Sequence, residues 1–112
     1  MYQYKENYIE INGNRREFKY NIGKVEQYKN MYMVLVEVPY DKDDINNIYC
    51  LDEQANIVWQ SEDLGKLYPT IKNLPYIRMA IVDDVIYACD FMGRNYLINV
   101  ETGKIEGCKF VK

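Results

Sequence analysis

The chain has 112 residues, of which 48% are hydrophobic and 28% charged, and its formal net charge is −3. This length suits one domain with one core, and the composition excludes a disordered or collagen-like chain. The negative charge argues against nucleic acid as the main partner, because backbone phosphates would repel the chain.

The first predicted element is a hairpin over residues 8–20. Two runs of alternating apolar and polar residues flank Asn12, Gly13 and Asn14. An Asn-Gly pair between such runs is the strongest short-range signal for a β-hairpin. We therefore expect the chain to open with two antiparallel strands.

A meander unit is predicted next, over residues 25–60. Residues 31–38 are its most apolar run, with apolar side chains on both faces, so this strand is expected to be central and covered on both sides. A second hairpin follows, in which residues 47–51 pair with residues 56–60. It contains Trp59, the single tryptophan, which we expect to be a buried core anchor.

Residues 61–76 are predicted to form an irregular connection. Ser61 is expected to be the N-cap of one helical turn, which Gly65 and Pro69 keep short. Apolar residues in the connection favour a strap that covers one end of the sheet, whereas its length also suits a lid or binding loop.

A second meander unit is predicted over residues 77–111, as four consecutive antiparallel strands. Turn residues separate the strands, namely Asp83-Asp84, Gly93, and Glu101-Thr102-Gly103. Period-2 alternation predicts one buried face. The residues expected on that face are Val85, Tyr87, Cys89 and Phe91 in one strand and Tyr96, Ile98 and Val100 after it.

The two meander units show a faint internal echo, because Asn47, Glu53 and Ile57 recur at the same spacing as Asn95, Glu101 and Ile105. Neither unit can bury its apolar face alone, so the two are expected to stack. The sequence therefore predicts a single all-β domain over residues 1–112. Its antiparallel meander units form a two-sheet sandwich or a partly open barrel, with at most one short helix in the connection 61–76.

Catalysis, metals and cofactors are not expected. The chain has no histidine, which excludes Ser-His and Cys-His nucleophile pairs and histidine metal sites. The acidic run DKDDINN lacks the glycine and the spacing of a calcium loop. Carboxylates at Asp83, Asp84 and Asp90 lie close in sequence, but Asp83 and Asp84 occupy a predicted hairpin turn, where aspartate is favoured for turn geometry alone. No phosphate-binding glycine motif follows a strand.

Cytoplasmic localisation is expected. The N-terminus lacks the pattern of a secretory signal, and no apolar segment is long enough to span a membrane. Three widely spaced cysteines, Cys50, Cys89 and Cys108, neither form a disulfide framework nor a CxxC metal knuckle. We expect them to be reduced, small hydrophobic residues in or near the core.

Two resemblances add to these predictions. The segments YCLDEQANIVWQ (residues 49–60) and YLINVETGKI (residues 96–105) resemble the outer hairpin of quinoprotein-type β-propeller blades, although Ala55 stands where that motif usually has glycine. Over residues 20–112, the chain is similar to small, uncharacterised bacterial all-β proteins. Some of these resemble immunity proteins of polymorphic or contact-dependent toxin systems, which implies a protein partner.

The leading functional prediction is a non-catalytic protein that binds another macromolecule, as an immunity protein that neutralises a basic toxin. Acidity and the 12 tyrosines favour it, since tyrosine provides a rigid contact area with a polar tip. One alternative is a small-molecule-binding domain with a pocket beneath the 61–76 connection, and another is a structural protein that forms homo-oligomers through strand edges. The predicted partner-facing residues are Tyr40, Asp41, Asp43, Asp44, Glu62, Asp63 and Tyr68.

Overall fold

The computed structural model describes residues 1–39 and 41–110. Within this part of the chain, antiparallel strands dominate and one short helix is present, which confirms the predicted all-β class. No helix in it has the length and apolar character needed to cross a membrane. The elements are β1 (Tyr2–Lys5), β2 (Tyr8–Ile11), β3 (Asn14–Glu17), β4 (Ile22–Tyr28), β5 (Met31–Val36), β6 (Ile48–Leu51), β7 (Ile57–Gln60), α1 (Leu64–Leu67), β8 (Tyr76–Val82), β9 (Val85–Asp90), β10 (Arg94–Asn99) and β11 (Ile105–Phe110).

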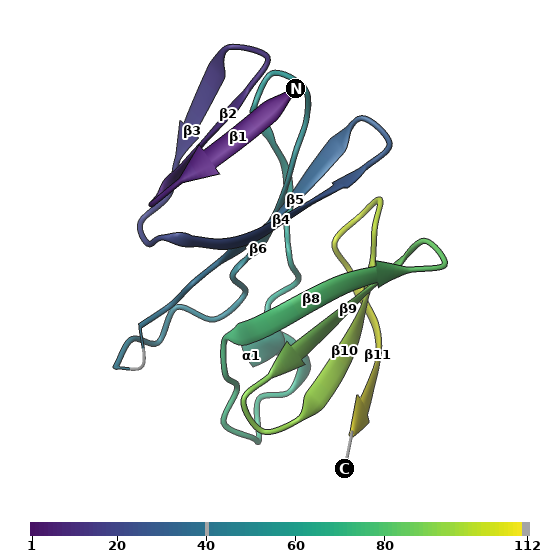
Figure 1. The fold of residues 1–112 in the computed structure, drawn as a ribbon. Helices are drawn as coiled ribbons and strands as arrows, with labels where there is room; N and C mark the ends of the chain where they lie inside the picture. Colours follow the sequence, from purple (N-terminus) through teal and green to yellow (C-terminus); the bar gives the residue numbers. More distant parts are fainter. Residues whose placement is uncertain (40, 111–112) are drawn as a thin grey trace.

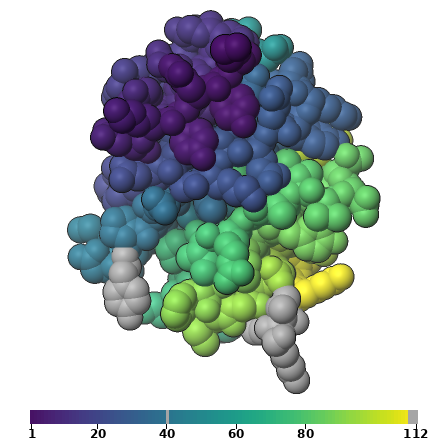
Figure 2. All heavy atoms as spheres, in the orientation of Figure 1, coloured from purple at the N-terminus to yellow at the C-terminus, as the bar shows by residue number. Residues whose placement is uncertain are grey.

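The strands form three sheets, each a meander of strands that are consecutive in sequence. The N-terminal sheet has the order β1-β2-β3, the middle sheet β4-β5-β6-β7, and the C-terminal sheet β8-β9-β10-β11 (Figure 1). None of the three closes into a barrel. Figure 2 shows the three sheets as successive layers in chain order, from purple through blue to green and yellow.

Local sequence explains the hairpins. Asn12 and Gly13 both have positive φ, 50° and 84°, and join β2 to β3 at the predicted place. Asp83 and Asp84 adopt φ of 49° and 64° between β8 and β9, which is the two-residue turn that matches strand twist. Strand β1 was not predicted, because the positive φ of 53° in the turn before β2 lies at Glu6 and not at a glycine or at the neighbouring Asn7.

Strand β5 lies between the two other sheets. Met33 and Leu35 belong to the hydrophobic cluster shared with the C-terminal sheet. Tyr32 and Val34 belong to the cluster shared with the N-terminal sheet. The expectation that this strand is covered on both sides is confirmed.

Trp59 is buried, as predicted, with 8% of its surface exposed. Its indole Nε1 donates a hydrogen bond to the carbonyl oxygen of Val100 at 3.2 Å. The side chain therefore joins β7 of the middle sheet to the end of the C-terminal sheet.

The predicted buried face of the C-terminal sheet is half wrong. Tyr96, Ile98 and Val100 are buried as expected, but the register places Ala88 opposite Tyr96 and Ile86 opposite Ile98. Cross-strand partners share a face of the sheet, so the inner face of β9 consists of Ile86, Ala88 and Asp90. The predicted residues of β9, which are Val85, Tyr87 and Cys89, lie on the opposite face, and Phe91 beyond the strand is exposed.

The helix in the connection begins later than predicted. Ser61 is buried, and its amide donates to the carbonyl of Ile48, so it continues the pairing of β7 with β6. Asp63 is the N-cap of α1 instead, and its Oδ1 accepts a hydrogen bond from the amide of Gly65 at 2.9 Å. The prediction of Ser61 as N-cap is therefore wrong.

Candidate functional site

The outer face of the C-terminal sheet has an apolar central row, and within residues 1–39 and 41–110 no other sheet covers it. Its central row crosses four strands, with Ala80 opposite Tyr87, Tyr87 opposite Leu97, and Leu97 opposite Gly107. A Cβ atom on Gly107 would lie 3.6 Å from Leu97 Cδ1, so the leucine side chain extends over the glycine. Neither Tyr87 nor Leu97 belongs to either core cluster. We call this surface the open face; with its flanking rows it comprises Arg78, Ala80, Val82, Val85, Tyr87, Cys89, Asn95, Leu97, Asn99, Glu106, Gly107 and Lys109.

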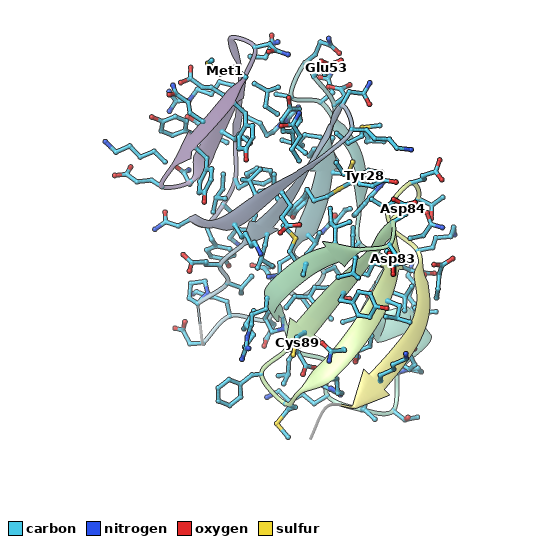
Figure 3. All side chains as sticks on the ribbon, turned by 45° about the vertical axis from the view of Figure 1, so that its right-hand side comes forward. Met1, Tyr28, Glu53, Asp83, Asp84 and Cys89 are labelled. Atoms are coloured by element: carbon cyan, nitrogen blue, oxygen red, sulfur yellow. The ribbon has the colours of Figure 1, made fainter. Side chains whose placement is uncertain are left out.

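The two ends of the open face carry opposite charge. Arg78 and Lys109 lie at the end that contains Cys89, through the pairs Arg78 with Cys89 and Asn95 with Lys109. At the other end, Glu106 accepts a hydrogen bond from Asn99 Nδ2 at 3.3 Å. The β8–β9 turn with Asp83 and Asp84 lies at this acidic end, and Figure 3 shows the two aspartates well separated from Cys89.

The acidic turn is anchored to the middle sheet. The hydroxyl of Tyr28 donates a hydrogen bond to Asp84 Oδ1 at 2.7 Å, and this bond raises the pKa of Tyr28. Asp84 is therefore engaged within the chain, whereas Asp83 and Glu106 provide the exposed carboxylates at this end of the open face.

The outer surface of the N-terminal sheet, at the opposite end of the three stacked sheets, differs from the open face. On the outer side of the N-terminal sheet, Gln3 Nε2 donates to Glu10 Oε1 at 3.1 Å, and Arg15 pairs with Glu17 at 3.0 Å. The Arg15 guanidinium also lies 3.8 Å from the centre of the Tyr8 ring. This surface therefore consists of polar and charged side chains that contact one another, and it does not need a covering sheet.

Strand register relates the open face to a covered face in the same chain. In the middle sheet Cys50 pairs with Trp59, and the register shifts at the next residue of β6. In the C-terminal sheet Leu97 pairs with Gly107, with the same kind of shift at the next residue of β10. Cys50 and Trp59 are buried against the C-terminal sheet. The equivalent face one sheet later is the open face, which no sheet in the described part of the chain covers.

A hollow adjoins the open face where β8 begins. It has a volume of about 1850 Å³, and its lining is mainly apolar. It is lined by residues 71–80, the loop before β6, the β9–β10 turn with the start of β10, and by individual residues of three other strands, Gly23 and Lys24 of β4, Leu35 of β5, and Tyr87 and Cys89 of β9. The predicted pocket under the connection thus has a counterpart, although the connection lines only one side of it.

A buried ion pair shapes the β9–β10 turn at the rim of this hollow. Asp90 Oδ2 accepts from Arg94 Nε at 2.7 Å, and Asp90 Oδ1 accepts from the amides of Met92 and Arg94. Arg94 Nη2 also donates to the carbonyl of Lys72 at 3.0 Å. The fixed turn holds Phe91 and Met92 outward, with 77% and 65% of their surfaces exposed. Asp90 is thus a structural carboxylate, at the opposite end of β9 from Asp83.

The acidic loop before β6 was predicted to face a partner. Tyr40 lies outside the described residues. Asp41 and Asp43 are exposed. Asp44 is engaged by the chain itself, because its carboxylate accepts from the hydroxyl of Tyr20 and from Lys19 Nζ. These two bonds lower the pKa of Asp44, the bond from Tyr20 more than that from Lys19.

The other predicted residues also make internal contacts. Glu62 Oε1 accepts from the amide of Ile105 at 2.8 Å, and Asp63 caps α1. The ring of Tyr68 packs against Tyr96 with 6.0 Å between centroids. Asn46 links this segment to the acidic loop, since its Nδ2 donates to Asp63 Oδ1. The two loops lie side by side, but most of their acidic groups support the fold.

The open face itself was missed, although the sequence carries a signal for it. Strand β9 has apolar residues on both faces, Ile86 and Ala88 on one and Val85, Tyr87 and Cys89 on the other. The same pattern in β5 predicted cover on both sides. Applied to β9, it predicts a surface that needs a partner.

No arrangement of three or more metal-binding side chains occurs among residues 1–39 and 41–110. Burial raises the pKa of the Cys50 thiol to about 12, so this thiol is protonated and inert at neutral pH. The other two cysteines are free as well.

Comparisons with known proteins place the fold and the family. No curated protein sequence matches the chain. Among solved structures, the crystal structure of the computationally designed Ika8 protein is similar, with a TM-score of 0.62 at 9% sequence identity. The match covers 92% of this chain and 30% of the designed chain, so it concerns the fold alone. Residues 1–110 match the family described as a domain of unknown function, DUF7957, and the chain therefore belongs to this family.

Proposed function

We propose that this protein is a non-catalytic protein-binding module whose docking surface is the open face. One observation carries the proposal: the face equivalent to the covered face of the middle sheet has an apolar central row in the C-terminal sheet, and no sheet formed by the described residues covers it. Contiguous exposed apolar patches of this kind mark interaction surfaces in soluble proteins. The polar outer surface of the N-terminal sheet provides the internal contrast.

The size of the hollow beside β8 favours a protein as the partner over a small molecule. Pockets for small ligands enclose about 300–1,000 Å³ and surround most of the ligand. The hollow beside β8 is larger, about 1850 Å³, and merges with a sheet face rather than closing over a ligand. A protein surface can fill such a shape, with Phe91 and Met92 as protruding contacts at its rim.

The partner must match the chemistry of the open face. It would present apolar side chains to Tyr87 and Leu97, a carboxylate to Arg78 or Lys109, and a basic group to Glu106 or Asp83. Of the expected basic toxin, we keep only the broader class, a protein partner. The reason is that Asp44, Glu62 and Asp63 make contacts within the chain.

Site-specific photo-crosslinking in the cells that produce the protein tests this function. Benzoylphenylalanine replaces Leu97 on the open face or, as the matched control, Glu10 on the outer surface of the N-terminal sheet. We expect a discrete protein adduct from position 97 and none from position 10. The second substitution Tyr87→Asp should abolish the adduct, since it places a charge in the centre of the apolar row. Equal adducts from both positions, or none from position 97, would refute the proposal.

A further inference from the structure

We infer that the partner of the open face is a second copy of this chain, packed face to face about a two-fold axis that runs across the strands. This inference rests on the proposed function and names its partner. It predicts a dimer in which two C-terminal sheets form a sandwich between the two molecules.

The asymmetry of the stack excludes a head-to-tail arrangement. Such packing would place the open face of one copy on the outer surface of the N-terminal sheet of the next. That surface carries Lys5, Glu10, Arg15 and Glu17, and those charges that met the apolar central row of the open face would lose water without new partners. An isologous contact instead buries apolar surface from both copies, as symmetric dimers do.

Charge selects the direction of the two-fold axis. An axis parallel to the strands would place the basic end of one copy against the basic end of the other, so that Arg78 of one copy would face and repel Lys109 of the other. An axis across the strands reverses the strand direction in the second copy. It then brings Lys109 near Glu106 of the other copy and Arg78 near the acidic β8–β9 turn, and like-charge contact is replaced by attraction.

The central row also suits contact with itself. About an axis across the strands, each residue of this row meets its own counterpart. Large side chains at Tyr87 and Leu97 stand between the small residues Ala80 and Gly107, so the middle of the face protrudes and its two sides are low. Tyr87 and Leu97 would therefore contact the same apolar side chains of the second copy, with the two sheets twisted by about 30° at the usual separation of about 10 Å.

Area limits the strength of the contact. Four strands spaced about 4.8 Å apart, with about five residues each at about 3.3 Å per residue, give a footprint of roughly 300 Å². Stable specific interfaces bury about 800 Å² per partner. Even with Phe91 and Met92 added, we expect a weak dimer that dissociates on dilution.

Sedimentation velocity over about a hundredfold range of concentration tests the inference, with circular dichroism to verify folding. We expect the wild type to change from monomer to dimer within that range. Leu97→Asp should remain monomeric throughout, whereas Glu10→Lys, on the outer surface of the N-terminal sheet, should behave as the wild type.

Charge reversal tests the arrangement. Lys109→Glu and Glu106→Lys should each weaken the dimer by about tenfold, and the double variant should regain wild-type association because the pair is restored in swapped form. A wild type that stays monomeric at every concentration, or a double variant weaker than both single variants, would overturn the inference. If benzoylphenylalanine at position 97 then crosslinks to a different protein, the proposed function stands, but a second copy of this chain is excluded as the partner. A dimer-sized adduct of this chain would support both.

Discussion

Gly103 lies directly against the ring of Trp59. A Cβ atom added to this glycine would lie 2.5 Å from Trp59 Cε3 and 2.6 Å from Cδ2. The glycine belongs to the β10–β11 turn, whereas the tryptophan lies on β7 of the middle sheet. Together with the hydrogen bond from the indole to Val100, this contact fixes how the C-terminal sheet sits on the middle sheet.

Gly103→Ala is therefore expected to be strongly destabilising. The substitution adds a methyl group where a buried ring leaves no room, which costs about 1–3 kcal/mol, in addition to the left-handed backbone at φ +76°. Gly13→Ala is the matched control, because Gly13 has φ +84° and nothing within 4 Å of the added atom. It should cost only about 1–2 kcal/mol for the backbone.

The β6–β7 turn of the middle sheet supports the distinction between the steric cost and the backbone cost. Ala55 lies in the β6–β7 turn, where the quinoprotein-type hairpin that this segment resembles usually has glycine. It adopts a φ of 64°. Alanine is thus compatible with that backbone when space permits. Urea denaturation of both variants measures the difference, and equal losses for Gly103→Ala and Gly13→Ala would contradict the role given to Trp59.

The ion pair between Asp90 and Arg94 should be far more important for stability than the exposed pair between Arg15 and Glu17. Arg94→Leu leaves the fully buried carboxylate of Asp90 without its guanidinium, and removing one partner of a buried pair costs about 3–5 kcal/mol. Arg15→Leu removes an exposed pair at nearly the same distance. Such pairs contribute about 0–1 kcal/mol. Thermal or urea unfolding of the two variants compares them directly, and similar losses would show that burial does not matter here.

Alkaline pH should destabilise the protein through Tyr96. Burial raises the pKa of this tyrosine from 10.0 to about 12. Because the folded state holds the proton more tightly, the stabilisation is complete below pH 10 and is lost as the pH rises towards 12. Tyr96→Phe removes the ionisable group, so the stability of this variant should fall less steeply between these two pH values. Urea midpoints at several pH values measure the slopes, with Tyr4→Phe on the exposed β1 as control. Parallel curves for the wild type and Tyr96→Phe would argue against the effect.

Local chemistry explains which parts of the fold the sequence predicts. The hairpin at Asn12 and Gly13 and the two-sided cover of β5 both follow from patterns within a few residues. Strand β1 was missed because the positive φ of its turn lies at Glu6, a residue type that does not signal a turn. The cap of α1 depends instead on a pairing over a longer range, since Ser61 donates its amide to the carbonyl of Ile48 and so continues β7.

Prediction of the candidate site from the sequence is limited in the same way. Acidic loop residues were expected to face a partner because loops often carry recognition. Tertiary contacts instead engage Asp44 with Lys19 and Tyr20, and Glu62 with the amide of Ile105. Sequence alone could not show these contacts, since the partners lie more than 20 residues away in each case.

The orientation of β9 provides the last prediction. Alternation gives two apolar faces, and only the register with β10 determines which one meets the middle sheet. Ile86 is fully buried on the inner face, whereas its neighbour Val85 is half-buried on the open face. Ile86→Ala should therefore cost about 2–5 kcal/mol, the usual range for truncating a buried isoleucine. Val85→Ala should cost clearly less, because its side chain already contacts solvent and leaves no closed cavity. Denaturant midpoints, measured at a concentration well below that of the proposed dimer, compare the two variants without a contribution from association. A larger loss for Val85→Ala would mean that the covered and the open face are exchanged, and the docking surface would then have to be sought on the side of Ile86.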